Sequence, residues 1–300
     1  MLQPLSDVYS ITGIAVRNDT EICVSMVLDE LGLDPENPHA ALYSLTPDLA
    51  AQIAFHPQAV VGMCYADSNT LIAVAESGEV FLHAGEDTRA EKIERDGGPL
   101  RNICMAGDQP VVCGANLQLM RRSPAGTWGS YDLDDRLRSD FGSIHLEAVD
   151  AYDENEIYAV GRDGMIMWFD GLVWNPVQCP TNLSFLSVCC GRDGTVYVGG
   201  QTGIVATGRH DSFTISTPED PLNDIWGIQE FAGTVYCAMM RALMSWDAAD
   251  GLQVVPGAME DTLTFYNLEV GQSVLWSAGE EDVVRFDGKS WTRIDAVNVE

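Results

Sequence analysis

Residues 146–179, LEAVDAYDENEIYAVGRDGMIMWFDGLVWNPVQC, decide the fold of this chain. Short runs of alternating apolar residues are separated by turn sequences such as Asp170-Gly171. Asp-Gly between such runs is a strong hairpin signal, because Gly adopts the positive φ that a two-residue turn requires. One four-stranded unit cannot bury both of its faces alone, so we expect it to recur. Its strands are expected over Leu146–Ala151, Ile157–Val160, Met165–Phe169 and Val173–Val177.

The second strand of this unit recurs at a nearly constant spacing. Positions equivalent to Tyr158 follow one another along the chain at steps of 50, 39, 47, 39, 39 and 40 residues, and the Asp-Gly-x-x-Trp pattern at Asp170 returns 117 residues later at Asp287. A period near 40 residues with four strands per unit is typical of a β-propeller blade. The aligned second-strand positions are Ile22, Ile72, Val111, Tyr158, Tyr197, Tyr236 and Trp276.

The sequence therefore predicts an all-β protein, a seven-bladed β-propeller of four-stranded antiparallel blades, with residues 1–300 as one domain. We find no apolar spacing of 3.6 over ten or more residues, so the repeats are not expected to be helical. The head and the tail of the chain are the natural pieces to close the ring. The expected blades span about 8–55, 60–94, 100–133, 145–179, 185–217, 225–256 and 265–295.

The charge balance is strongly acidic, with 16 Lys and Arg against 45 Asp and Glu, a formal net charge of −29. Such a field repels nucleic acid and anionic lipid and attracts basic partners. The N-terminus lacks a basic region and a cleavage signal, and no run of 18 apolar residues occurs. The eight cysteines lack metal-ligand spacing and fall mainly on inner strands, so we expect reduced core thiols and a cytoplasmic location.

Two insertions interrupt the repeat, Asp29–His39 inside blade 1 and Asp134–Ser143 between blades 3 and 4. In an up-and-down blade, the link from second to third strand lies at the same end as the link to the next blade. Both insertions should therefore rise from one face, where loops on a rigid scaffold commonly bind partners. The expected partner-binding acids are Asp29, Glu30, Asp34, Glu36, Asp134, Asp135, Asp140, Glu219, Asp220, Glu260, Asp261, Glu280, Glu281 and Asp282.

Trp226 joins this candidate surface for a different reason. Five of the other tryptophans, namely Trp128, Trp168, Trp174, Trp246 and Trp291, recur in register on third and fourth strands, which indicates packing between blades. Trp226 instead begins a first strand near the acidic end of blade 6, so we expect it to contact the partner.

The sequence predicts no catalytic residue, no metal site and no cofactor. The histidines have no paired spacing, and the two GRDG copies, at Gly161 and Gly191, fall between different strand pairs and are expected to be turns. A calcium-dependent hydrolase of the lactonase type would need several polar side chains at the starts of the first strands. Those positions are mainly apolar, as at Val60, Ile103 and Leu186.

The segments IYAVGRDGMIMWFDGLVW and VVRFDGKSWTRID resemble the repeats of bacterial propellers related to the YCF48-like and Kelch-like groups. The match is good in blades 4 and 7, partial in 5 and 6, and faint in 1–3. This resemblance implies a binding scaffold rather than a reaction. Bacterial propellers of this kind also resemble immunity proteins that neutralise secreted toxins.

We therefore expect a non-catalytic, protein-binding propeller, with a cytoplasmic immunity protein as the favoured interpretation. Its partner would be a basic protein, such as a nuclease toxin, with no nucleic acid or membrane bound. Two alternatives stay open, namely the propeller hydrolase and an assembly factor that scaffolds a larger complex.

Overall fold

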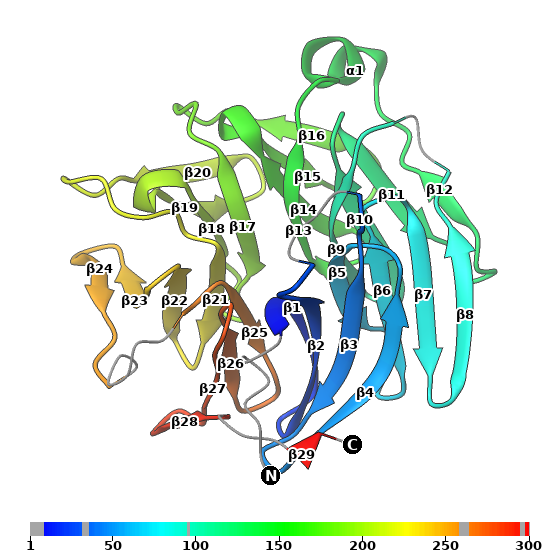
Figure 1. Ribbon diagram of the computed structural model, residues 1–300. Helices are drawn as coiled ribbons and strands as arrows, with labels where there is room; N and C mark the ends of the chain where they lie inside the picture. The colour runs from blue at the N-terminus through cyan, green and yellow to red at the C-terminus, as the bar shows by residue number, and fades with distance from the viewer. Residues whose placement is uncertain (1–8, 32–35, 95–96, 258–263, 295–297, 300) are drawn as a thin grey trace.

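The computed structural model describes residues 9–31, 36–94, 97–257, 264–294 and 298–299. Seven antiparallel sheets stand around a central axis, each with its first strand innermost (Figure 1). The predicted seven-bladed propeller of four-stranded blades is confirmed.

The blades follow the chain in order. Blade 1 holds β1 (Tyr9–Asn18), β2 (Glu21–Leu28), β3 (Ala40–Leu45) and β4 (Leu49–His56); blade 2 holds β5 (Val60–Tyr65), β6 (Thr70–Ala75), β7 (Glu79–Ala84) and β8 (Asp87–Lys92); blade 3 holds β9 (Leu100–Ala106), β10 (Gln109–Gly114), β11 (Gln118–Arg122) and β12 (Trp128–Ser130). Blade 4 holds β13 (Leu146–Asp153), β14 (Glu156–Gly161), β15 (Ile166–Phe169) and β16 (Trp174–Val177); blade 5 holds β17 (Phe185–Cys190), β18 (Val196–Gly200), β19 (Val205–Arg209) and β20 (Ser212–Ser216). Blade 6 holds β21 (Gly227–Phe231), β22 (Thr234–Met239), β23 (Ala242–Asp247) and β24 (Gly251–Val254); blade 7 holds β25 (Asn267–Val270), β26 (Leu275–Ala278), β27 (Val283–Phe286) and β28 (Trp291–Arg293).

We call the end of the disc that carries the β2–β3-type links and the links between blades the loop face. The opposite end, where short turns join first to second and third to fourth strands, is the turn face. The first GRDG copy forms a 3₁₀ turn at Arg162–Gly164 on the loop face, and the second forms the β17–β18 turn on the turn face. The two copies are turns at opposite ends, as expected.

The glycine that ends the YAVG motif allows a close backbone approach. A Cβ on Gly161 would lie 2.1 Å from the carbonyl oxygen of His145, and the next amide, that of Arg162, donates to this same oxygen at 2.9 Å. Gly200 meets the Ser184 carbonyl in the same way. In blades 4 and 5 the motif therefore joins the end of the second strand to the segment that begins its own blade.

Aromatic side chains fill the gaps between blades. The ring of Tyr131, at the end of blade 3, lies 5.1 Å from Phe169 and 5.4 Å from Trp174 of blade 4, in edge-on contacts. Trp174 is only 3% exposed. The tryptophans that recur on third and fourth strands thus pack between blades, where edge-to-face pairs add stability to the burial of area.

The ring closes between blades 7 and 1. Trp276 is 1% exposed and packs in the same core as Ile14, while the amide of Ile11 donates to the Glu280 carbonyl at 2.8 Å. The tail adds β29 (Asn298–Val299), which pairs in parallel with β4 at the outer edge of blade 1. The tail therefore contributes a strand, whereas the head, residues 1–8, lies outside the described residues.

One helix was not expected. The insertion before blade 4 folds as α1 (Asp135–Phe141), whose N-terminus is capped by the Asp134 carboxylate accepting from the Arg136 amide at 2.6 Å (Figure 1). Leu137 is buried beneath it. Seven residues are too few for the apolar period of a helix to show, and only Leu137 marks the buried side.

The eight cysteines are free thiols in this structure. Cys23, Cys113 and Cys237 lie on second strands, and burial raises the pKa of each thiol. Cys179 follows β16 rather than ending it, and it is partly exposed. Most of these thiols therefore behave as small apolar residues.

A buried histidine pair joins blades 1 and 2. The Nε2 atoms of His56 and His83 lie 3.1 Å apart, His83 Nδ1 is 3.1 Å from Thr88 Oγ1, and His56 stacks on Phe81 with ring centroids 3.7 Å apart. One ring must donate and the other accept, so at most one of the two rings is protonated. Burial, and then the charge of His83, lower the pKa of His56 to about 4, and burial lowers that of His83.

This pair predicts a loss of stability in acid. The unfolded chain binds protons on these histidines near pH 6.5, whereas the folded chain does not. The free energy of unfolding therefore falls as the pH drops from 6.5 toward 4, and His56 accounts for about 2 kcal/mol of this fall. His56→Gln should remove that part of the acid dependence. Urea unfolding at pH 7 and pH 4.5 measures it, and an equal acid loss in variant and wild type would contradict the assignment.

Candidate functional site

The two insertions do lie on the loop face. Asp29 and Glu30 are exposed at the end of β2, and the Asp29 carboxylate accepts from Ser10 Oγ at 2.7 Å. The helix α1 rises from the same face between blades 3 and 4 (Figure 1). Blades 2 and 3 separate the two insertions, so they form two acidic projections rather than one cluster.

A groove lies beside α1. It has a volume of about 380 Å³ and is lined by Asp134, Asp140, Leu137 and Phe141 together with residues of β16. Asp135 and Asp140 are exposed on the helix, whose basic residues Arg136 and Arg138 offset part of the charge. The helix thus holds acidic side chains around a partly apolar hollow.

A second acidic group lies at blades 5 to 7. Glu219 and Asp220 are exposed in the link from blade 5 to blade 6, and Glu280 and Glu281 are exposed between β26 and β27. Within the described residues, the side chains of these four form no hydrogen bond or ion pair, nor do those of Glu30, Asp135 and Asp140. Their charges are available to a partner. Glu36 is also exposed on this face.

Not every expected contact residue is available to a partner, because some form hydrogen bonds or ion pairs within the protein. Asp282 is only 3% exposed, pairs with Arg293 at 2.6 Å and accepts from the Thr264 amide at 2.8 Å. It therefore holds its loop and is not presented to a partner. Asp224, an acid of the same face that was not among the expected contacts, is partly buried and accepts from the Thr202 amide at 2.9 Å. Asp34, Glu260 and Asp261 lie outside the described residues.

Trp226 lies just before β21 and is 44% exposed. Its ring is 6.2 Å from that of Tyr266 in the link to blade 7. Met240 is also 44% exposed, and its carbonyl accepts from the amide of Phe265, the residue before Tyr266. We call Trp226, Met240 and Tyr266 the mouth patch, because Trp226 also lines the central channel.

The acids of the turn face are used differently. Asp170 accepts hydrogen bonds from the amides of Val173 and Leu172. These bonds lower the pKa of its carboxyl, and the bond from Val173 has the larger effect. Such side-chain acceptors stabilise tight turns. The same arrangement recurs at Asp67, Asp153, Asp193, Asp247 and Asp287.

The turn face also ties blades to one another. Arg17 of blade 1 donates to the Ser68 carbonyl of blade 2 at 2.6 Å, and Arg192 of blade 5 donates to the Gly271 and Gln272 carbonyls of blade 7 at 2.6 and 3.1 Å. Many charged side chains on the turn face therefore stabilise turns or link one blade to another. Exposed acids that accept no side-chain hydrogen bond among the described residues lie on both faces, for example Asp48 and Asp108 on the turn face, but the two insertions lie on the loop face alone.

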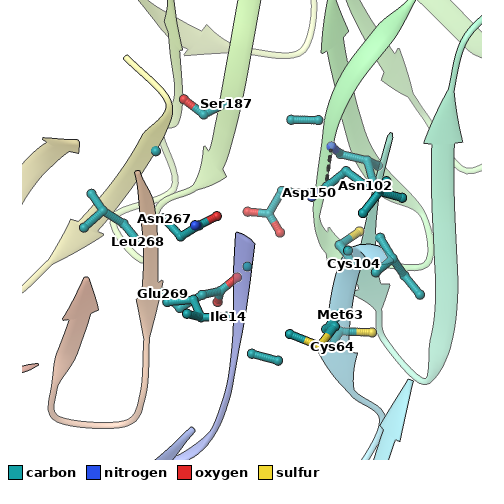
Figure 2. A pocket seen from close by; sticks show the side chains of 18 of the residues that line it. Ile14, Met63, Cys64, Asn102, Cys104, Asp150, Ser187, Asn267, Leu268 and Glu269 are labelled. Carbon is teal, nitrogen blue, oxygen red and sulfur yellow. Dashed lines mark hydrogen bonds between the residues drawn. The ribbon is translucent and has the colours of Figure 1, made fainter. Parts of the chain in front are cut away.

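The central channel carries more polar side chains than the first-strand starts indicated. Val60 at the start of β5 and Ile103 within β9 do contribute apolar atoms, but polar side chains also line the cavity, which measures about 390 Å³ (Figure 2). Because side chains alternate along a strand, neighbours such as Asn102 also reach the axis. The pairing of first with second strands aligns one residue per blade, namely Val16, Cys64, Cys104, Asp150, Cys189, Gln229 and Glu269. This alignment was already available from the repeat, and it places two carboxyl groups at one level.

Asp150 and Glu269 both point into the channel (Figure 2). Asp150 accepts from the Cys190 amide at 2.7 Å and the Ala151 amide at 2.9 Å, yet burial still raises its pKa. Burial first, and then the Asp150 charge, raise the pKa of Glu269 to about 8. No hydrogen bond to the Glu269 side chain is present among the described residues. The channel therefore holds a carboxyl that loses its proton only with difficulty.

Neither metal nor membrane features stand out in the described part of the chain. It contains no group of three or more His, Cys, Asp or Glu side chains placed to hold a metal ion. None of its helices is long and apolar enough to cross a membrane.

Solved structures share the fold at low sequence identity. The extracellular domain of BT4673 from B. thetaiotaomicron aligns with a TM-score of 0.70 at 14% identity, over 95% of this chain and 39% of that one. Virginiamycin B lyase from Staphylococcus aureus aligns with a TM-score of 0.64 at 11% identity, over 78% of this chain and 83% of that one. YCF48 bound to a D1 peptide aligns with a TM-score of 0.60 at 12% identity, over 79% of this chain and 81% of that one. These similarities show the propeller fold alone.

No protein-family model matches the chain. The chain is similar to a curated protein, the immune protein Tsi7 of Pseudomonas aeruginosa. The two are 33% identical over 228 residues, which cover 73% of each chain. Identity at this level over most of both chains goes beyond a shared fold. The chain belongs to the family of the immune protein Tsi7.

Proposed function

We propose that this protein is an immunity protein that neutralises a toxin by binding it in the cytoplasm, without catalysing a reaction. The observation that carries the proposal is the relationship to an immune protein at 33% identity. The toxin bears a basic surface and docks on the loop face.

Charge supports the choice of partner and face. A net charge of −29 attracts basic proteins, and the unengaged acids of the described chain include seven on the loop face. A nuclease fits this chemistry, because a cleft that binds nucleic acid is itself basic. An acidic face over that cleft would exclude the substrate.

Neutralisation is the direct test. The tagged chain is used to capture its partner from the bacterium that encodes it, and the partner is identified by mass spectrometry and expressed in a host that lacks the chain. We expect growth to stop, and to resume when the chain is co-expressed. A captured partner that is harmless would favour the assembly-factor alternative, and hydrolysis of a lactone by the purified chain would favour the hydrolase.

Association with the toxin should depend on the blade 1 insertion. Replacing Asp29, Glu30, Asp34 and Glu36 by Ser removes four negative charges, which should slow association about tenfold at low salt and flatten its salt dependence. Stopped-flow mixing at several salt concentrations measures this. One substitution would not suffice, because a single rim charge is worth under about 1 kcal/mol.

The control removes three exposed acids from the turn face. Asp48, Glu86 and Asp108 suit this purpose, since they are exposed and accept no side-chain hydrogen bond among the described residues. Turn acids such as Asp67 would be unsuitable, because their loss would disturb a turn. A control variant that slows association more than the blade 1 variant would place the partner on the turn face.

A further inference from the structure

The mouth patch has the composition of a binding hot spot. Of the seven tryptophans, all of which the structure describes, only Trp226 is exposed. Exposed tryptophans with a partly buried aromatic neighbour are enriched where interfaces derive most of their binding energy. Trp226 and Met240 thus present apolar area that no part of the described chain covers.

The charge around this patch is mainly negative. Glu280 and Arg241 both act on the Tyr266 hydroxyl, and burial and Glu280 raise its pKa. Glu281 follows Glu280, and Glu219 and Asp220 lie in the link from blade 5 to blade 6 that leads to Trp226, so the acids outnumber Arg241. An apolar centre with an acidic rim suits a basic, partly apolar segment.

Polar and acidic side chains also line the central channel beyond Trp226. Asn267 and Gln229 line the cavity, and Asp150 and Glu269 point into it (Figure 2). Glu269 lies three residues beyond Tyr266, about 10 Å along the strand. A long cationic side chain on a loop that enters the mouth would approach both carboxyl groups.

We propose that the mouth patch receives a protruding loop of the toxin, whose arginine or lysine side chain passes Trp226 and enters the channel toward Asp150 and Glu269. This inference rests on the proposed function and names the centre of its interface. The apolar stem of that side chain would pass over the indole, and its cationic end would favour the ionised form of Glu269 beside Asp150. The acidic insertions at Asp29–His39 and at α1 would then act at the rim.

Variants of Trp226 and Glu269 test the inference, with the toxin identified by the capture experiment as the probe. Trp226→Ala should weaken binding at least ~30-fold, and Glu269→Gln about tenfold. Leu172→Ala is the matched control, since Leu172 is 87% exposed on the turn face, and it should bind within about twofold of wild type. Calorimetry measures the affinities, and thermal unfolding checks that each variant is folded.

A small probe tests the channel without the toxin. Nα-acetyl-L-argininamide should shift the indole N–H resonance of Trp226 in a saturable way at millimolar concentration, and Glu269→Gln should abolish the shift. Nα-acetyl-L-glutaminamide, which carries no charge, should cause none. Binding should strengthen between pH 6.5 and 8.5 as Glu269 ionises, because the other titratable groups that face it, Asp150, Cys64, Cys104 and Cys189, do not offset its charge.

The outcomes separate the two proposals. A toxin that is neutralised by wild type and bound equally well by Trp226→Ala and Glu269→Gln would overturn this inference and leave the proposed function standing. If no toxin is neutralised, the proposed function fails. Absence of an argininamide shift in wild type would overturn the inference in either case.

Discussion

Replacing Glu269 by Gln is expected to raise the free energy of unfolding by about 3 kcal/mol at pH 8.5 and to change it little at pH 5. The pKa of Glu269 is raised to about 8 by burial and by Asp150. The unfolded chain gives up this proton near pH 4.5, so the stability present below that pH is lost as the pH rises to about 8. Gln carries no charge and removes the loss. The figure allows for screening, because the side chain is partly exposed to the channel.

Urea unfolding of both proteins between pH 5 and 8.5 measures the difference. Glu280→Gln is the control, since Glu280 is exposed on the loop face and its replacement should change stability by less than about 0.5 kcal/mol. A Glu269 variant that is less stable than wild type at pH 8.5 would show that the carboxylate is stabilised in the channel. That result would contradict the electrostatics described above.

Replacing Gly161 by Ala should cost about 3 kcal/mol of stability. The added Cβ would meet the His145 carbonyl oxygen at 2.1 Å and the Leu146 Cα at 2.8 Å, and both belong to backbone that cannot rotate away. The shift needed would also strain the hydrogen bond from the Arg162 amide to that carbonyl. Thermal and urea unfolding measure the cost.

Gly129→Ala provides the comparison. A Cβ on Gly129, in the outer strand β12, meets nothing within 4 Å, so its stability should stay within about 0.5 kcal/mol of wild type. Equal stability of the two variants would show that blade 4 can shift its first strand. The glycine of YAVG would then have no packing role.

The blades could be predicted because each repeats the same hairpins. The step of about 40 residues between second strands, together with Asp-Gly turns at Asp170 and Asp287, determined both the strand count and the blade count. The end of the disc that carries the two insertions followed from strand direction alone. Neither conclusion needed knowledge of side-chain contacts.

Other features depend on contacts that the repeat does not encode. The helix α1 is held by the Asp134 cap and by Leu137, which is too little apolar signal to identify a helix. Asp282 was expected on the surface, but its pairing with Arg293 and the Thr264 amide buries it. The parallel pairing of Asn298–Val299 with β4 joins the two ends of the sequence, and no local pattern predicts it.

The channel carboxyls could have been found earlier. Aligning the first strands through their partners on the second places Asp150 and Glu269 at equivalent positions. The prediction instead considered strand starts, where Val60 and Leu186 are apolar. The raised pKa of Glu269, however, required the three-dimensional arrangement, because it arises from burial and from a carboxylate on another blade.

The central claim is that the loop face of this propeller covers a toxin. Hydrogen–deuterium exchange of the chain alone and in complex with its purified toxin tests it most directly. The account predicts slowed exchange in residues 217–226, 240–241 and 279–282 around the mouth patch and in residues 134–142 at α1, with the turns at 66–70 and 191–195 unchanged. Protection of those turns, with the loop face unaffected, would contradict it.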